Sequence, residues 1–257
     1  MDMHVSRRQL LHIGTLASVL AVAGCTGDEP DDDDEEDADT APDTYAEPAI
    51  PPDAVSDGFD IEAMHATTID AIESVPFTIV GHATEWQDDA HVWSEAMQLE
   101  GDGTRGYFIH GMDESAPIGT AVEQAADWIA HFFDGSHEWT HTPDGTVDHR
   151  EATYDQYTQL IVLLLEDLAA AGDAFSFQAP AWDDERGVYT IAADGYDGPE
   201  DITISHLVVT LSRDGVLIGI DTELASNGDT LEMYMDSEMD AAVDISVPDW
   251  VADAERD

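Results

Sequence analysis

The sequence predicts an α+β fold: a curved, mostly antiparallel half-barrel sheet with one leading helix and one middle helix. Apolar and polar residues alternate with period two in many segments, most clearly over 215–225 and 229–237. Turn signals such as Asp102-Gly103 and Asp144-Gly145 separate neighbouring segments and are typical of hairpins. A long antiparallel sheet with one apolar face has to bury that face against helices, itself or a ligand.

The leading helix is expected to begin after Asp60, a residue type favoured at helix N-caps, because apolar residues follow at helical spacing. Pro76 is expected to end it. A first group of strands is then predicted over 77–86, 90–99, 105–112, 126–134, 137–142 and 146–151.

The middle helix is predicted from Tyr154 to Ala171, with an apolar face and Gly172 as its C-cap. A second group of strands is predicted over 174–178, 187–193, 202–212, 215–225 and 229–237.

The N-terminus predicts export and lipidation. Arg7 and Arg8 precede a short apolar run that ends in Val22-Ala23-Gly24-Cys25, the order of a twin-arginine signal closed by a lipobox. Cleavage before Cys25 leaves a thiol and an amine that can carry lipid. We therefore expect a protein held by lipid at the extracellular face of the cell membrane.

The domain boundaries follow from composition. Residues 1–24 are the predicted signal peptide, and residues 25–58 form an acidic, proline-containing tether that is expected to stay extended and disordered because it cannot bury a core. Residues 59–252 form the predicted half-barrel domain, and residues 253–257 an acidic tail.

The charge balance excludes several functions. The chain has 7 basic residues, all of them Arg, against 58 acidic ones, for a net charge of −51. Molar salt shortens the screening length to roughly 3 Å and removes most of the resulting repulsion, so the composition resembles that of proteins from extremely halophilic archaea. Nucleic-acid binding is excluded, because no basic patch can form. The single cysteine, Cys25, leaves none for a disulfide or a thiolate metal site.

One segment matches a catalytic pattern. His137-Glu138-Trp139-Thr140-His141 fits H-E-x-x-H of zinc peptidases, which requires a helix. Turn signals flank the segment closely, so a strand is expected instead; its two histidines would then lie roughly 13 Å apart, too far to share a zinc ion. A zinc metallopeptidase stays a minor alternative, as does a metal site assembled from His131, His149 or His206 with either histidine.

No signature of an enzyme or a cofactor site remains, so a non-enzymatic protein without a cofactor is expected. Aromatic and Met side chains on the predicted strands are instead candidates for lining a hydrophobic cavity. These candidates are Phe77, Trp93, Met97, Tyr107, Trp128, Phe132, Met233 and Met235. The alternative is that they pack under the two helices.

The chain resembles haloarchaeal surface lipoproteins and, more distantly, the half-barrel carriers that include the lipoprotein chaperone LolA and mycobacterial LprG. The resemblance rests on the lipobox, on a leading helix followed by strands that a middle helix interrupts, on Phe132-Phe133-Asp134-Gly135 entering a hairpin, and on the closing Val247-Pro248-Asp249-Trp250-Val251. In those carriers the concave face of the sheet holds acyl chains or lipoprotein tails.

The resemblance implies a protein that binds a lipid or another apolar molecule in a half-barrel cavity. LolA is soluble whereas this chain is expected to be anchored, which implies retention or hand-off at the membrane. The alternative is a surface domain for protein–protein contact or envelope architecture, with the sheet filled by its own side chains.

Overall fold

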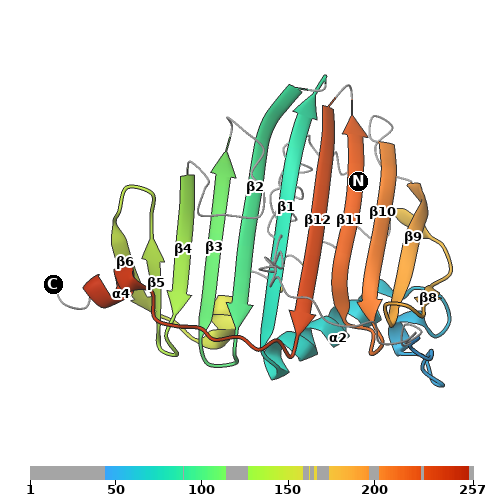
Figure 1. Ribbon diagram of the computed structural model, residues 1–257, viewed down its shortest axis with the longest axis horizontal. Helices are drawn as coiled ribbons and strands as arrows, with labels where there is room; N and C mark the ends of the chain where they lie inside the picture. Colours follow the sequence, from blue (N-terminus) through green and yellow to red (C-terminus); the bar gives the residue numbers. More distant parts are fainter. Residues whose placement is uncertain are drawn as a thin grey trace, which may run out of the picture.

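The computed structural model describes residues 44–88, 90–113, 127–158, 162, 165–166, 174–196, 203–226 and 229–254. Its strands form one open, curved sheet of 12 strands, and every named strand pair is antiparallel (Figure 1). The strand order is β6-β5-β4-β3-β2-β1-β12-β11-β10-β9-β7, with β8 paired to β9 outside this path. The predicted fold class is confirmed.

The strands match the predicted segments closely. The first group is β1 (Phe77–Gln87), β2 (Ala90–Gly101), β3 (Gly106–Asp113), β4 (Asp127–Phe133), β5 (His137–His141) and β6 (Val147–Glu151). The second group is β7 (Phe175–Phe177), β8 (Ala181–Asp183), β9 (Val188–Tyr196), β10 (Thr203–Ser212), β11 (Leu217–Ser226) and β12 (Asp229–Met239). Only the short β8 had no predicted counterpart. The two groups join where β1 pairs with β12 along its whole length.

The leading helix α2 (Ile61–Ser74) begins where the N-cap signal predicts it. The Asp60 side chain accepts a hydrogen bond from the amide of Ala63 at 2.9 Å. Met64, Thr68 and Ile72 form its buried side. The helix therefore forms for local reasons and is fixed to the sheet by one apolar stripe.

The middle helix is described in part, with helical residues at 154–158, 162 and 165–166; the remainder of the predicted stretch lies outside the described residues. Tyr157 is 7% exposed, and its hydroxyl lies 2.7 Å from the carbonyl oxygen of Glu100 and 2.8 Å from that of Tyr107. These contacts hold the start of the helix against the ends of β2 and β3.

The two helices pack on the same face of the sheet, here called the helix face. Its main core joins Met64 and Ile72 of α2 to Phe77 and Leu99 on the strands and to Leu165 of the middle helix. Residues on each strand alternate between this face and the opposite one.

A C-terminal strap, residues 240–254, crosses the opposite face, here called the strap face (Figure 1). The strap includes helix α4 (Asp249–Ala254), which the sequence did not predict. Ile245 and Val251 are 5% and 1% exposed, and they pack against Phe132 and Trp139. The strap thus buries the outer end of the strap face.

The folded part of the chain also starts earlier than predicted. The sequence predicts that residues 44–58 end an extended tether, but Tyr45 is hydrogen-bonded to β8 and to the turn after it. Its amide donates to the carbonyl of Asp184 at 2.7 Å, and the Trp182 indole donates to the Tyr45 carbonyl at 3.0 Å. The 3-10 helix η1 (Asp53–Val55) buries Ala54 in the main core. Among the described helices, none has the length and apolar character needed to cross a membrane.

Candidate functional site

The structure divides the residues predicted to line one cavity between the two faces of the sheet. The strand registers place one group on the helix face: Phe77, Trp93, Met97, Met233 and Met235. The registers place the others on the strap face: Tyr107, Trp128 and Phe132. Because the sheet separates the two groups, no single cavity contains all of them.

Part of the helix face is filled by the protein's own side chains. Phe77 and Met97 are fully buried, and Met235 is 7% exposed. All three belong to the main core together with Met64 and Ile72 of α2. Phe77, Met97 and Met235 therefore pack in the protein's own core, as the alternative interpretation of the sequence expects, and do not line a cavity.

The far end of the helix face is apolar and less covered. Met112 and Ile129 are 39% and 36% exposed, although both are large hydrophobic residues. Leu224, Leu231 and Met233 are partly buried on the same face and belong to none of the core clusters that the described residues form. These five residues are here called the apolar strip. Exposed apolar area of this kind marks a surface that can accept an apolar partner.

Charged and histidine side chains lie beside the apolar strip on β2 to β6, and Glu95 among them is buried. The carboxylate of Glu95 contacts Nε2 of His110 on the next strand. Further along, Oε1 of Glu138 lies 2.9 Å from Nδ1 of His131, and its Oε2 accepts from Nε of Arg150 at 2.6 Å. Burial lowers the pKa of His131, which the negative charge of Glu138 opposes.

The H-E-x-x-H segment forms strand β5, as predicted. His137 and His141 pair with residues on the strap face, whereas Glu138 points to the helix face, where Arg150 holds it. The two histidines and the carboxylate therefore lie on opposite sides of the sheet. The described residues contain no group of three or more side chains that could hold a metal ion. Neither a zinc-peptidase site nor a histidine metal site forms among them.

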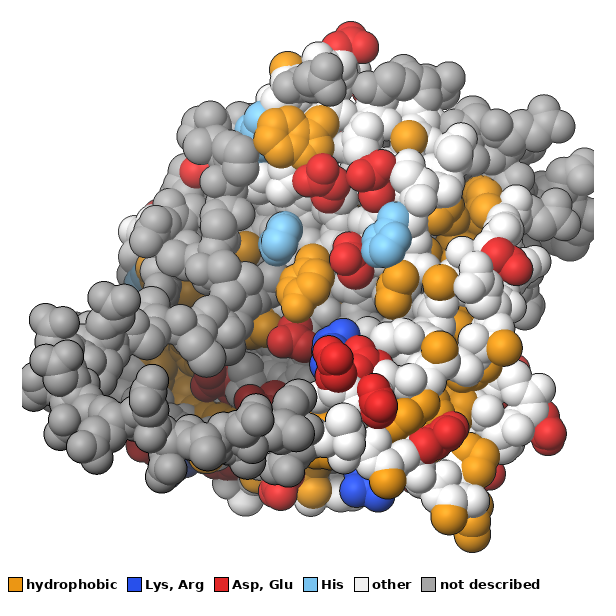
Figure 2. All heavy atoms as spheres, turned by 45° about the vertical axis from the view of Figure 1, so that its right-hand side comes forward, with side chains coloured by type: hydrophobic (Ala, Val, Ile, Leu, Met, Phe, Trp, Pro, Cys, Tyr) orange, Lys and Arg blue, Asp and Glu red, His pale blue; other side chains and the backbone are white. Residues whose placement is uncertain are grey.

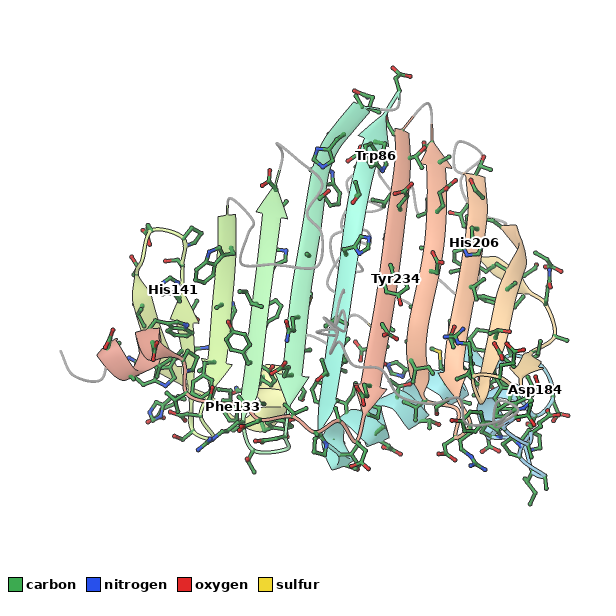
Figure 3. The ribbon with its side chains drawn as sticks, viewed as in Figure 1. Trp86, Phe133, His141, Asp184, His206 and Tyr234 are labelled. Atoms are coloured by element: carbon green, nitrogen blue, oxygen red, sulfur yellow. The ribbon has the colours of Figure 1, made fainter. Side chains whose placement is uncertain are left out.

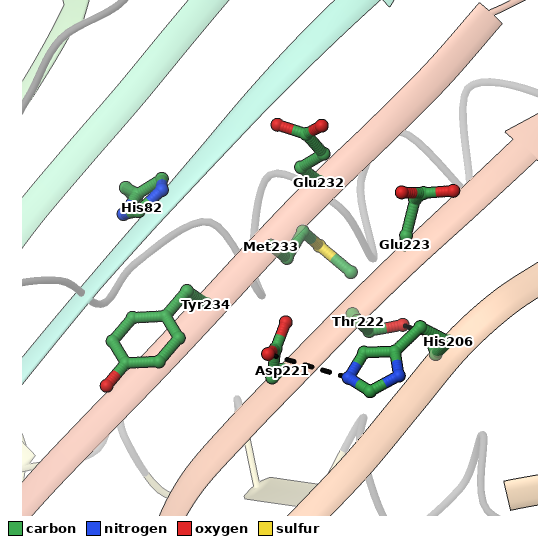
Figure 4. Close-up of a pocket in the computed structure, with 8 residues that line it drawn as sticks. All are labelled: His82, His206, Asp221, Thr222, Glu223, Glu232, Met233 and Tyr234. Carbon is green, nitrogen blue, oxygen red and sulfur yellow. Dashed lines mark hydrogen bonds and ion pairs between the residues drawn. The ribbon is translucent and has the colours of Figure 1, made fainter.

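A pocket of about 400 Å³ lies on the strap face, near the middle of the sheet (Figure 4). Its side chains come from adjacent strands: His82 on β1, Tyr234 and Glu232 on β12, Asp221 and Glu223 on β11, and His206 on β10. Thr222 and Met233 also contribute to its wall. Figure 3 shows Trp86, Tyr234 and His206 along this part of the sheet. Met233 is thus the one predicted cavity residue that borders this pocket.

The pocket is polar and negatively charged. Nε2 of His206 lies 3.5 Å from Oδ2 of Asp221, and the indole of Trp86 donates to Glu232 at 3.1 Å. Burial lowers the pKa of His82, although Glu232 and Asp221 raise it. Acidic and histidine side chains gather on the surface that Figure 2 shows. Such a lining suits water and cations and disfavours an acyl chain, which would have to desolvate the carboxylates.

The three predicted residues on the strap face are covered by the strap. Phe132 is fully buried under it, and Trp250 of the strap packs on the same small cluster of buried residues as Tyr107 and Trp128. The ring of His141 stacks on Trp128 with centroids 4.8 Å apart. These aromatic residues attach the C-terminus to the sheet.

The predicted export residues Arg7 and Arg8 and the predicted lipidation residue Cys25 lie outside the described residues. The pocket, by contrast, was not predicted at all. Its histidines, His82 and His206, are distant in the sequence and border one pocket only because β1, β12, β11 and β10 are consecutive strands of the sheet.

No family model matches this sequence, and the search of curated proteins found no match. Solved structures do show similarity. A DUF1329 family protein from Desulfovibrio piger is 11% identical, with a TM-score of 0.27 over 72% of this chain and 95% of that one. LprF from Mycobacterium bovis is 11% identical, with a TM-score of 0.34 over 73% of this chain and 96% of that one. At these scores the fold assignment rests on this chain's own strand pairing.

Proposed function

We propose that this chain is an exported lipoprotein, anchored through Cys25 at the extracellular face of the cell membrane. It binds a lipid or another apolar molecule on the helix face of its sheet and catalyses no reaction. The observation that carries the proposal is the apolar strip, whose residues Met112 and Ile129 stay more than a third exposed. A bound hydrocarbon chain would remove this area from water, at about 25 cal/mol per Å².

The composition of the strip favours a ligand with a flexible hydrocarbon chain. Met112 and Met233 have unbranched, polarizable side chains that adapt to irregular partners. The strand register places Met112 and Met233 in one row, with Glu95 and Ala83 between them, so the two parts of the strip lie on either side of the centre of the sheet. A carrier of apolar molecules needs such an adaptable surface more than a set of fixed polar contacts.

Ligand binding is tested with the full chain carrying Cys25→Ser, purified in molar salt. We expect the apolar dye N-phenylnaphthylamine to bind and fluoresce, and solvent extraction followed by mass spectrometry to recover a bound lipid. Met233→Gln is expected to weaken dye binding, whereas Tyr234→Gln, which changes the neighbouring residue on the opposite face, leaves it unchanged. A chain that binds no dye and carries no lipid contradicts the proposal.

Anchoring is tested separately by membrane fractionation of the producing cells. Wild-type protein is expected with the membrane, Cys25→Ser protein in the medium, and protein with Arg7→Lys and Arg8→Lys inside the cell, because a twin-lysine signal is not exported by the twin-arginine route. Cys25→Ser protein that stays with the membrane would show that lipid on this residue is not the anchor.

A surface domain for protein contact is the second candidate. It is favoured by the burial of Phe77, Met97 and Met235 in the protein's own core and by the open acidic pocket on the strap face. Crosslinking on intact cells distinguishes the two: this candidate expects a discrete protein partner lost on Tyr234→Ala and retained on Met233→Gln.

A further inference from the structure

Glu95 is a buried carboxylate with an incomplete set of hydrogen-bond partners. It is 2% exposed. One oxygen, Oε1, contacts Nε2 of His110, but within the described part of the chain no donor reaches the other oxygen, Oε2. A buried carboxylate oxygen without a donor is costly, so a native structure usually keeps one for a reason.

The position of Glu95 connects it to the apolar strip. Its strand neighbours on the helix face are Met112, directly opposite on β3, and Ala83, directly opposite on β1; Ala83 in turn pairs with Met233 on β12. Glu95 is therefore the one ionisable residue in a row that otherwise contributes apolar side chains from Met112 to Met233. Met112, the neighbour of Glu95 on β3, is 39% exposed, so the strip meets solvent one strand away from the buried carboxylate.

We propose that the apolar strip takes an amphiphile whose head group donates a hydrogen bond to Oε2 of Glu95, while its hydrocarbon chain lies along Met112 and Met233. This inference rests on the proposed function and specifies the ligand class of the same surface. A hydroxyl or an ammonium group supplies the required donor. A carboxylate or phosphate monoester head would face the charge of Glu95 without a cation to neutralise it.

Two of the described carboxylates near the strip already have side-chain partners. Glu138 is held by Arg150 and His131, and Glu85 accepts from the indole of Trp93. Glu95 differs from these two carboxylates in having a buried oxygen that no donor of the described residues reaches. Because a carboxylate accepts and never donates, the selectivity of the site is for donors.

The test compares head groups on one chain length. The full chain carrying Cys25→Ser is loaded with N-phenylnaphthylamine in molar salt, and the dye is displaced by dodecanol, dodecylamine or methyl dodecanoate. Dodecanol and methyl dodecanoate are both uncharged, but only the alcohol donates. We expect dodecanol to displace the dye at a concentration about tenfold lower than the ester, the effect of one hydrogen bond to a charged acceptor.

Dodecylamine distinguishes a ligand with an ammonium head group from one with a hydroxyl head group. Displacement by the amine at still lower concentration than by the alcohol identifies an ammonium head, and equal displacement identifies a hydroxyl head; both support a donor site. Equal displacement by alcohol and ester overturns the inference but leaves the proposed function intact. If the dye and all probes fail to bind, the proposed function falls and this inference with it.

A variant assigns the effect to Glu95. In Glu95→Gln the amide oxygen can keep the contact with His110 and turn its N–H group toward the ligand, so the preference for alcohol over ester is expected to shrink to about twofold or less. Glu238→Gln removes the same charge from an exposed position on the strap face of β12 and is expected to retain the full preference. An unchanged preference in Glu95→Gln contradicts the assignment. The wild-type comparison decides the question even if this variant fails to fold.

Discussion

The hydroxyl of Thr68 on α2 accepts a hydrogen bond from the backbone amide of Leu217 on β11 at 3.0 Å, although 149 positions separate the two residues. The same hydroxyl donates to the carbonyl of Met64 at 2.8 Å. Thr68 is 2% exposed and Leu217 1% exposed. The leading helix is thus fixed to the sheet by a buried polar contact at the start of a strand, beside its apolar stripe.

Replacing Thr68 by Val keeps the shape of the side chain and removes both hydrogen bonds. The buried amide of Leu217 is then left without an acceptor, so we expect the free energy of unfolding to fall by about 1–3 kcal/mol. Urea denaturation in molar salt measures this change. Thr67→Val is the matched control. Among the described residues, the Thr67 hydroxyl bonds to the carbonyl of Ala63 within its own helix, and the loss in this variant is expected to stay under about 0.5 kcal/mol. Similar losses for both variants would contradict the role of the Leu217 contact.

Gly106 at the start of β3 is required by the ring of Tyr157. A Cβ atom at this position would overlap the ring atoms of Tyr157. Tyr157 is itself fixed by its hydroxyl contacts, so the ring cannot move away freely. We expect Gly106→Ala to lower the free energy of unfolding by about 1–3 kcal/mol, because the added methyl group overpacks this site.

The control for this prediction is Gly195→Ala on β9, where the nearest atom to the added Cβ is Cβ of Ser176 at 3.4 Å, an ordinary contact. Its effect is expected to stay within about 0.5 kcal/mol. Thermal unfolding followed by circular dichroism measures both variants. Equal melting temperatures for the two would show that the middle helix tolerates displacement.

The strap contributes to stability through Val251. Val251 is 1% exposed and lies in the cluster that covers Phe132 and Trp139. We expect Val251→Ala to lower the free energy of unfolding by about 1–2 kcal/mol, because two buried methyl groups are lost and a small cavity remains. Val247→Ala, at a residue 45% exposed, is expected to change it by less than about 0.5 kcal/mol. A strap that contributes nothing would give the same small value for both.

The elements that the sequence predicted correctly are those with local causes. Asp60 caps α2 through its own side chain, and the predicted Asp-Gly turns place Gly103, Gly135 and Gly145 at positive φ, where glycine is favoured. The alternation within β11 and β12 likewise follows from the pleat of each strand. Each of these signals lies within a few consecutive residues.

The strap and η1 were missed because their stability is not local. α4 spans only Asp249–Ala254, and η1 only Asp53–Val55. Helices this short do not persist alone in water and form because Val251 and Ala54 bury against the sheet. Residues 44–58 contain three prolines and three acidic residues, and this composition gave no sign that Ala54 and Val55 are buried.

The candidate site was predicted only in part because it depends on register. Alternation shows that Met233 and Met235 share a face of their strand, but not that Tyr107 and Phe132 on other strands lie on the opposite face of the sheet. That assignment requires the pairing of each strand with its neighbours. The sequence could not predict that Oε2 of Glu95 has no donor among the described residues, because this depends on where all the neighbouring side chains lie in the folded protein.

The turn before β5 contributes to stability at low pH through Asp134. Burial alone would raise the pKa of this carboxyl, but hydrogen bonds from the Trp139 indole, at 3.1 Å, and from the amides of His137 and Ser136 outweigh burial and lower the pKa from 3.8 to about 2. A carboxyl with a depressed pKa in the folded state stabilises it above the unfolded value and loses this contribution as the pH falls. We expect the urea midpoint of the wild type to decrease between about pH 4 and pH 2.

Two variants test whether Asp134 causes part of this decrease. In Trp139→Phe, which removes the indole donor, the part due to Asp134 should shrink, and in Asp134→Asn that part should vanish. Identical pH profiles in wild type and Asp134→Asn would show that the hydrogen-bonded turn does not contribute to acid stability.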